Sequence, residues 1–213
     1  MTTLKDGIAV IPAFADPDTF SALKDSVINR PMGMRVHIPA HKRGVTIPYS
    51  DIRATHPEIA RFYQNDALAE RMSRVINARV MPTPLNDQSS CSVLIYEREG
   101  DRIGWHYDHN FYNGRHFTAL LPLVNENRLE QGLSSAELVV KTRCGTGTVL
   151  TPPNTLVLFE GAIVRHTVTP LRANERRIIL SMTFCANPTT RPLLNLQRRF
   201  KEIAYIGIRA LWT

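Results

Sequence analysis

The sequence predicts a mainly β fold with flanking helices, arranged as a double-stranded β-helix, or jelly roll. Three observations support this prediction. Apolar residues recur at helical spacing in the first part of the chain, short β-rich runs separated by turns begin near residue 89, and a helical pattern returns after residue 192. A length of 213 residues fits one domain. We expect helical support over about 1–88, a jelly-roll core over about 89–186 and a C-terminal helix over about 192–211.

The first thirty residues contain one strand pattern and one helix pattern. The apolar run at 7–14 is typical of a strand. Asp16-Pro17-Asp18 then resembles a helix start, because Asp is a favoured cap and Pro fits the first turn. The apolar residues that follow at helical spacing are Phe20, Leu23, Val27 and Ile28.

The next segment, residues 30–50, is rich in proline, glycine and basic residues. This composition predicts a loop or lid in which short strands can occur. Thr55 and Glu58 then match the spacing of a capping box, with Thr55 as N-cap and Glu58 reaching back to it. Two helices are expected from this point, over about 57–64 and 66–78.

The jelly-roll core is predicted from eight short β-rich runs with turn signals between them. Several short strands of this kind favour a sandwich or barrel, and their number fits a jelly-roll, cupin-like architecture. The runs are 91–96, 101–107, 116–124, 136–142, 147–150, 155–159, 163–169 and 176–185.

Composition limits the class of protein. With 43% hydrophobic and 21% charged residues the chain is an ordinary globular sequence. The longest apolar run, Ile8 to Ala15, is too short to span a membrane. Cys91, Cys144 and Cys185 are scattered and form no CxxC motif, which suits a reducing compartment and predicts a cytoplasmic location.

The net charge of +7 favours anionic partners, but the basic residues are spread along the chain. Basic and aromatic residues do not cluster as in proteins that bind nucleic acid, so we expect a small-molecule substrate and no nucleic-acid partner. The basic, amphipathic tail could dock on a membrane or a partner. Packing against its own barrel is the favoured reading of this tail.

A candidate metal-binding pair lies at His106 and Asp108. Residues i and i+2 of a strand point to the same side, so the imidazole and the carboxylate can hold one ion. His56-Pro57-Glu58 has similar spacing, but its proline and the preceding threonine favour a helix start. The pair at 106 and 108 is therefore the better metal site.

His166 is the candidate third ligand, within Val164-Arg165-His166-Thr167-Val168. Two histidines and one carboxylate form the facial triad of non-haem Fe(II) oxygenases and leave coordination positions open. Zinc accepts the same ligands, but a hydrolytic site would need a nearby general base, and the sequence indicates none.

A candidate anion-binding residue lies on the run at 176–185. Strand alternation places Arg177, Ile179, Ser181 and Thr183 on one face, and Ile178, Leu180 and Met182 on the other. An arginine fixed on a barrel strand can bind a carboxylate through its planar fork. Arg176 is an alternative for this role.

Taken in order, these motifs resemble the prolyl-4-hydroxylase-like branch of the 2-oxoglutarate/Fe(II) oxygenases. The resemblance covers about 91–185. The matching segments are Ser92 to Tyr96, Gly100, Trp105 to Asp108, Arg115 to Leu121, Leu156 to Phe159, His166 with Val168 and Pro170, and Arg177 to Phe184.

The resemblance implies a dioxygenase that uses Fe(II), 2-oxoglutarate and O2 to oxidise a C–H bond, with succinate and CO2 as products. It implies that the iron ligands are His106, Asp108 and His166. It also implies that Arg177 binds the distal carboxylate of 2-oxoglutarate, with Tyr96 and Ser181 nearby. An aspartate at 108 argues against the halogenase variant of this chemistry, in which a small residue leaves room for chloride.

Two departures from the family pattern weaken a prolyl-specific reading. Pro122 stands where relatives often have a tyrosine, and Ser134-Ser135-Ala136 replaces a common glycine pair. We therefore expect a small or medium-sized organic substrate, bound by the 30–50 segment and by the side chains of His109, Phe111, Tyr112 and Arg115. A protein (prolyl-type) hydroxylase and a non-catalytic jelly-roll binding module are the alternatives.

Overall fold

The computed structural model describes residues 4–30, 33–38, 41–190 and 197–198 of the chain. Its described strands form one antiparallel sheet in the order β1-β10-β7-β12-β5-β3-β6-β11-β8-β9, with β2 added on β3 and β4 on β12. The strands are β1 (Ile8–Ile11), β2 (Met34–Ile38), β3 (Lys42–Ile47), β4 (Met81–Pro82), β5 (Cys91–Tyr96), β6 (Arg102–His106), β7 (Asn113–Asn127), β8 (Leu138–Thr142), β9 (Gly145–Val149), β10 (Leu156–Phe159), β11 (Arg165–Val168) and β12 (Glu175–Asn187).

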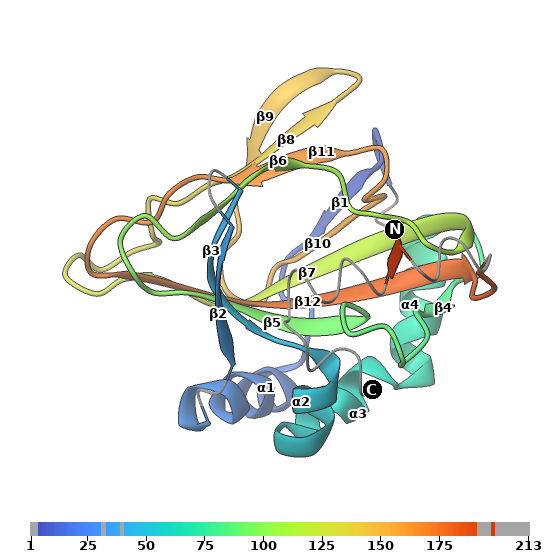
Figure 1. Ribbon diagram of the computed structural model, residues 1–213, viewed down its shortest axis with the longest axis horizontal. Helices are drawn as coiled ribbons and strands as arrows, with labels where there is room; N and C mark the ends of the chain where they lie inside the picture. The colour runs from blue at the N-terminus through green and yellow to red at the C-terminus, as the bar shows by residue number, and fades with distance from the viewer. Residues whose placement is uncertain (1–3, 31–32, 39–40, 191–196, 199–213) are drawn as a thin grey trace.

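The sheet curls over on itself (Figure 1). Strands β5, β7 and β12 form one layer, and β6, β8, β9 and β11 lie across from them. Strand β3 joins the layers, because its residues Val45–Ile47 pair with β5 while Lys42 and Arg43 pair with β6. This arrangement confirms the predicted jelly-roll fold class, and each of the eight predicted β runs corresponds to one of the strands β5 to β12.

Four helices cover the outer face of the β5–β12–β7 layer (Figure 1). They are α1 (Pro17–Asn29), α2 (Tyr49–Thr55), α3 (Pro57–Tyr63) and α4 (Asp66–Ile76). Helix α1 begins where the sequence predicts, because the Asp16 carboxylate accepts a hydrogen bond from the Thr19 N–H at 2.9 Å. Helix α2 was not expected.

The predicted capping box at Thr55 and Glu58 is wrong. Thr55 is the last residue of α2, where its hydroxyl donates to the Asp51 carbonyl, and His56 takes the cap position of α3 without a side-chain cap bond. Glu58 instead accepts a hydrogen bond from Ser26 and pairs with Arg30. The long-range contacts of Glu58 with α1 and its C-cap replace the local capping bond that the spacing indicates.

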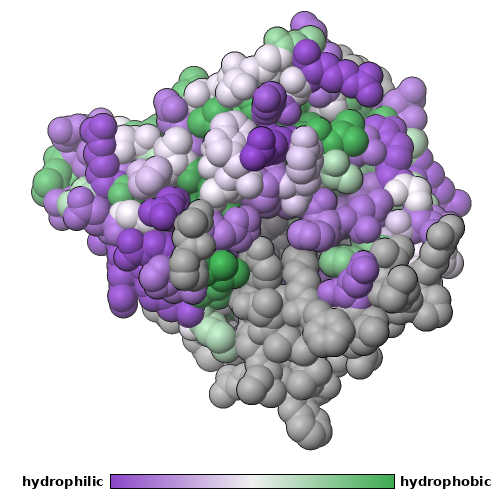
Figure 2. All heavy atoms as spheres, turned by 45° about the horizontal axis from the view of Figure 1, so that its top comes forward, coloured by the Kyte–Doolittle hydropathy of each residue, from purple (hydrophilic) through white to green (hydrophobic). Residues whose placement is uncertain are grey.

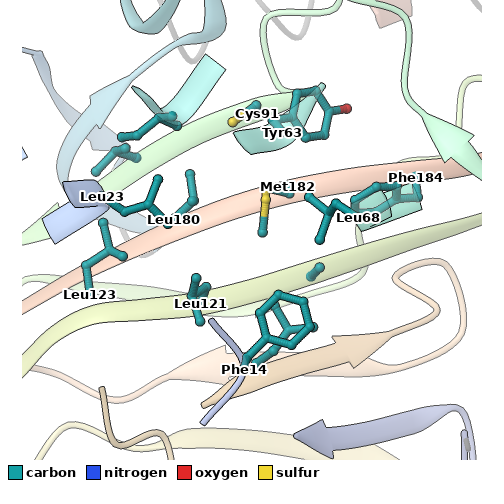
Figure 3. Packing of buried hydrophobic residues seen from close by; sticks show 14 of the residues in the cluster. Phe14, Leu23, Tyr63, Leu68, Cys91, Leu121, Leu123, Leu180, Met182 and Phe184 are labelled. Carbon is teal, nitrogen blue, oxygen red and sulfur yellow. The ribbon is translucent and has the colours of Figure 1, made fainter. Parts of the chain in front are cut away.

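The hydrophobic core lies between the helices and this layer. Leu23 and Leu68 of the helices pack against the β12 side chains Leu180, Met182 and Phe184 (Figure 3). Their neighbours on β7 and β5 with the same orientation complete the cluster. The opposite faces of β5, β7 and β12 are therefore left to line the interior of the curled sheet.

Short strands do occur in the segment at 30–50, where β2 and β3 pair with each other in antiparallel orientation. Its second strand is an integral part of the barrel. The predicted C-terminal helix at 192–211 lies outside the described residues, except for 197 and 198.

No described helix is long and apolar enough to cross a membrane. On the face shown in Figure 2, hydrophilic residues predominate and hydrophobic residues form small, separate groups. The described part of this face therefore carries no broad apolar patch.

Candidate active site

A cavity of about 210 Å³ lies inside the curled sheet. Alternation along β12 points Arg177, Ile179, Ser181 and Thr183 into it, while the residues between them enter the core. This division of faces was predicted for β12. Strand β7 follows the same rule, and its cavity-lining residues are His116, Thr118, Leu120 and Pro122.

His106, Asp108 and His166 meet at this cavity. His106 at the end of β6 is the direct strand partner of His166 on β11, and their ring centroids lie 4.1 Å apart. The Asp108 Oδ1 atom lies 3.6 Å from the His106 Nε2 and 3.8 Å from the His166 Nε2. One ligand atom from each residue lies within 4.8 Å of the other two.

Backbone carbonyls set the tautomer of both histidines. His106 Nδ1 lies 2.8 Å from the Gly104 carbonyl, and His166 Nδ1 lies 3.1 Å from the Val164 carbonyl. A carbonyl can only accept, so each Nδ1 carries the proton and each Nε2 keeps its lone pair. Burial and the neighbouring His166 lower the pKa of His106 to about 4, which keeps this imidazole neutral at pH 7.

The Asp108 carboxylate is held in one orientation. The Thr118 hydroxyl donates to Oδ2 at 2.6 Å, and the Asp108 N–H donates to the Gly161 carbonyl at 3.0 Å. These bonds leave Oδ1 as the oxygen that faces both histidines. Asp108 can therefore supply one oxygen to an ion while the other remains hydrogen-bonded.

This donor set fits a divalent first-row metal ion. Metal–ligand bonds of about 2.0–2.2 Å place two ligand atoms of one ion at most about 4 Å apart. Both Oδ1–Nε2 distances are within that limit. Two imidazoles and one carboxylate on one side of an ion leave its opposite side open to further ligands.

Arg177 provides a buried positive charge in the same cavity. Its side chain donates to the Thr151 hydroxyl at 3.1 Å and to the Ala136 carbonyl, whereas its Nε has no hydrogen-bond partner among the described residues. Burial lowers the pKa of Arg177 to about 10, so it stays charged at neutral pH. In the described part of the chain no carboxylate forms an ion pair with it.

Tyr96 and Ser181 line the cavity on the neighbouring strands β5 and β12. The Tyr96 hydroxyl is buried and has no described hydrogen-bond partner, and burial raises the pKa of this phenol to about 12. The phenol therefore stays protonated and can donate a hydrogen bond to an acceptor in the cavity. Arg176, the alternative to Arg177, pairs with Glu126 and does not line the cavity.

The two departures from the family pattern have different places in the site. Pro122 lines the cavity. Ser134 and Ser135 bind Asn125 and Glu175, and the carbonyl of the next residue, Ala136, accepts the hydrogen bond from Arg177. The segment that replaces the glycine pair thus helps to anchor the arginine.

Of the four candidate substrate residues, two line the cavity and two, Tyr112 and Arg115, do not. His109 and Phe111 line the cavity, with their rings stacked at 5.8 Å. The Tyr112 hydroxyl donates to Asp87, which itself lines the cavity. Arg115 lies outside the cavity, where it pairs with Glu160 at 2.8 Å.

Several cavity residues received no role from the sequence. Lys42 is buried on β3 and donates to the Thr46 hydroxyl at 2.9 Å, and both residues line the cavity. Thr118 lies two residues after His116 on β7, so the alternation of strand faces could have indicated that both side chains line the cavity. Thr151 lies far from Arg177 along the chain and outside any strand, so no local pattern indicates it.

A family model decides where the chain belongs. The model described as Halogenase D (HalD) matches residues 5–118, which is over half of the chain. The chain belongs to the HalD family. The matched region includes His106 and Asp108 but ends before His166 and Arg177. No curated protein sequence matches this HalD-family chain significantly.

Solved structures share the fold of this HalD-family chain. The non-heme alpha ketoglutarate dependent epimerase SnoN from nogalamycin biosynthesis is 13% identical, with a TM-score of 0.66 over 89% of this chain and 84% of its own. A prolyl-4-hydroxylase from Pseudomonas putida is 18% identical, with a TM-score of 0.58 over 84% and 91%. HygX from Streptomyces hygroscopicus, with nickel, 2-oxoglutarate and hygromycin B bound, is 13% identical, with a TM-score of 0.58 over 86% and 83%. The chain thus has the fold of 2-oxoglutarate/Fe(II) oxygenases.

The Thr118 contact leads to a prediction about metal affinity. Thr118→Val removes the hydroxyl that fixes Oδ2 of Asp108 and should weaken Fe(II) binding by roughly 10- to 100-fold, as is common when a partner of a ligating group is lost. Anaerobic titration with Fe(II) measures this change. Thr146→Val, at an exposed site on β9, is the control. Equal Fe(II) affinities for the two variants would show that the Thr118 contact has no part in metal binding.

Proposed function

We propose that this chain is an Fe(II)- and 2-oxoglutarate-dependent dioxygenase that hydroxylates or otherwise oxidises a C–H bond of a small or medium-sized organic molecule, forming succinate and CO2. The observation that supports it best is the presence of two complementary features in one cavity. The His106–Asp108–His166 set suits iron, and the buried Arg177 suits a carboxylate.

Each predicted residue has a proposed task. The two Nε2 atoms and the Asp108 Oδ1 bind Fe(II), and when bound the iron with 2-oxoglutarate supplies the oxidising power for C–H cleavage. Arg177 binds the distal carboxylate, because a buried guanidinium that forms no ion pair with the described carboxylates is stabilised by an incoming anion. The Tyr96 hydroxyl donates a hydrogen bond to the same molecule. Ser181 lies on the same cavity face of β12 as Arg177 and contributes a second hydroxyl.

Halogenation is the second candidate, favoured by the family to which the chain belongs. The position of Asp108 argues for oxygenation instead. Its Oδ1 faces both imidazoles at less than 4 Å, so a carboxylate fills the third ligand position that a halide would need. Oxygen insertion without halide incorporation is therefore the proposed outcome.

A small organic substrate fits the size of the cavity. A volume of about 210 Å³ has to hold both 2-oxoglutarate and the reacting part of the substrate. HygX, a neighbour in fold, was crystallised with a small molecule, hygromycin B, together with 2-oxoglutarate. Phe111 and His109 line the cavity on the side of the 109–113 loop and are the proposed substrate contacts.

The proposed function predicts coupled turnover that depends on iron. Purified chain with Fe(II), O2 and 2-oxoglutarate should form succinate, and a screen of small molecules should reveal those that accelerate it. Mass spectrometry with 18O2 should show oxygen in the product, with and without chloride. Asp108→Ala should abolish turnover. A chlorinated product would favour the halogenase reading, and stimulation by peptides alone would favour protein hydroxylation.

The proposed role of Arg177 predicts how its replacement changes the KM for 2-oxoglutarate. Arg177→Ala loses charge-assisted hydrogen bonds worth about 1.5–3 kcal/mol, so the KM for 2-oxoglutarate should rise about 10- to 150-fold with little change in Fe(II) affinity. Arg176→Ala is the matched control, because this neighbour pairs with Glu126 outside the cavity and should change the KM less than about twofold. An equal effect of both variants would remove Arg177 from the proposed role.

A change at Phe111 should impair oxidation of the substrate but not turnover of 2-oxoglutarate. Phe111→Ala removes apolar surface from the cavity wall and should impair substrate oxidation by about tenfold or more, because contact with an apolar side chain of this size is worth roughly 1.5 kcal/mol or more. Succinate formation without substrate should persist. Thr146→Val, at an exposed site on β9, is the control, and unchanged substrate kinetics in the Phe111 variant would place the substrate elsewhere.

A further inference from the structure

The backbone of Gly161 lies directly against Asp108. A Cβ atom at position 161 would lie 2.5 Å from the Asp108 Cβ and 2.6 Å from its Oδ2, whereas real Cβ atoms essentially never approach other atoms within 3.0 Å. The φ angle of Gly161 lies outside the left-handed region, so its backbone could accept any L residue. Contact with Asp108 therefore accounts for the glycine, and backbone conformation does not.

Rotation of the aspartate cannot relieve this contact. The Asp108 Cβ position is set by the backbone, and that backbone is tied to the same turn by the hydrogen bond from the Asp108 N–H to the Gly161 carbonyl. The turn itself is anchored, since Glu160 pairs with Arg115 and its carbonyl accepts the Val164 N–H. A side chain at 161 must displace the turn or the carboxylate.

We infer that Gly161 is a positioning residue for the metal-binding carboxylate. Its missing side chain creates the space in which Asp108 directs Oδ1 toward both histidines while Oδ2 remains bonded to Thr118. The metal-binding part of this inference rests on the proposed function. The steric part does not, because it depends only on the contact between positions 108 and 161.

The contact makes the two positions interdependent. With Asp at 108, position 161 must be glycine. Asp108→Ala keeps the Cβ atom and hence the 2.5 Å contact, whereas Asp108→Gly removes both clashing atoms. Alanine at 161 should therefore be harmful beside Asp or Ala at 108 and tolerated beside Gly. This pattern separates a specific contact from a general intolerance of the turn.

Metal binding tests the positioning role. In anaerobic titrations, Gly161→Ala should bind Fe(II) about 10- to 100-fold more weakly than wild type. With Co(II) as a probe, the visible absorption spectrum of the variant should change because the carboxylate has moved. Gly147→Ala is the matched control, since a Cβ there meets nothing within 4 Å, and it should keep wild-type affinity and spectrum.

Folding tests the steric pairing without any metal. Urea unfolding midpoints should fall on adding Gly161→Ala to wild type and to Asp108→Ala, and should stay unchanged on adding it to Asp108→Gly. Equal losses in all three backgrounds, or a double variant Asp108→Gly with Gly161→Ala that does not fold, would overturn the pairing. If Gly161→Ala itself does not fold, folding of that double variant supports the pairing.

The two proposals can fail separately. A wild-type chain that binds no Fe(II) would overturn the proposed function together with the positioning role. A wild-type chain that binds Fe(II), combined with a Gly161→Ala variant of equal affinity and identical Co(II) spectrum, would overturn the positioning role alone.

Discussion

The two-residue repeat of the long β7–β12 pair is the constraint on which the rest of the structure depends. These strands pair over most of their length. From Ile179–Pro122 to Cys185–His116 they keep one unbroken register, and this register decides which side chains meet the helices and which line the cavity. Phe117 and Phe184 face each other on the core side, while Thr118 and Thr183 face each other on the cavity side. A shift by one residue would move the polar set into the core and the apolar set into the cavity. Burial of the apolar face against the helices thus fixes the site as well as the fold.

Two buried groups in the cavity, one charged and one polar, can each bind a further partner. The Arg177 guanidinium is almost fully buried, and the Tyr96 hydroxyl beside it has no described partner. Burial of a charge is costly unless the charge is paired, and no described carboxylate lies within ion-pair distance of Arg177. A dianionic co-substrate with a metal-chelating end would satisfy Arg177 and Tyr96 at one end and bind the ion of the triad at the other.

The fold class and the candidate metal and anion ligands could be predicted from the sequence, because both depend on patterns between residues that are close along the chain. Strand alternation identifies the faces of β12, and the spacing of His106 and Asp108 places them on one side of the chain. Contacts between distant segments have no such signal. The Thr151 hydroxyl beside Arg177 and the Gly161 backbone beside Asp108 arise only from the way the sheet curls. The wrong capping box has the same origin, since Glu58 forms contacts with Ser26 and Arg30 that its local spacing does not indicate.

The chain belongs to the HalD family and carries Asp108, and this combination suggests how one fold could support different reactions. The two histidines are set by paired strands, and each is bonded to the carbonyl two residues before it, so these two members of the donor set are built into the fold. Asp108 instead follows the strand and is held by Thr118 and by a turn from a distant segment. A change at position 108 can therefore alter what occupies the third ligand position without disturbing the barrel. In the proposed function, the outcome of the reaction depends on that single carboxylate and on the space that Gly161 leaves for it.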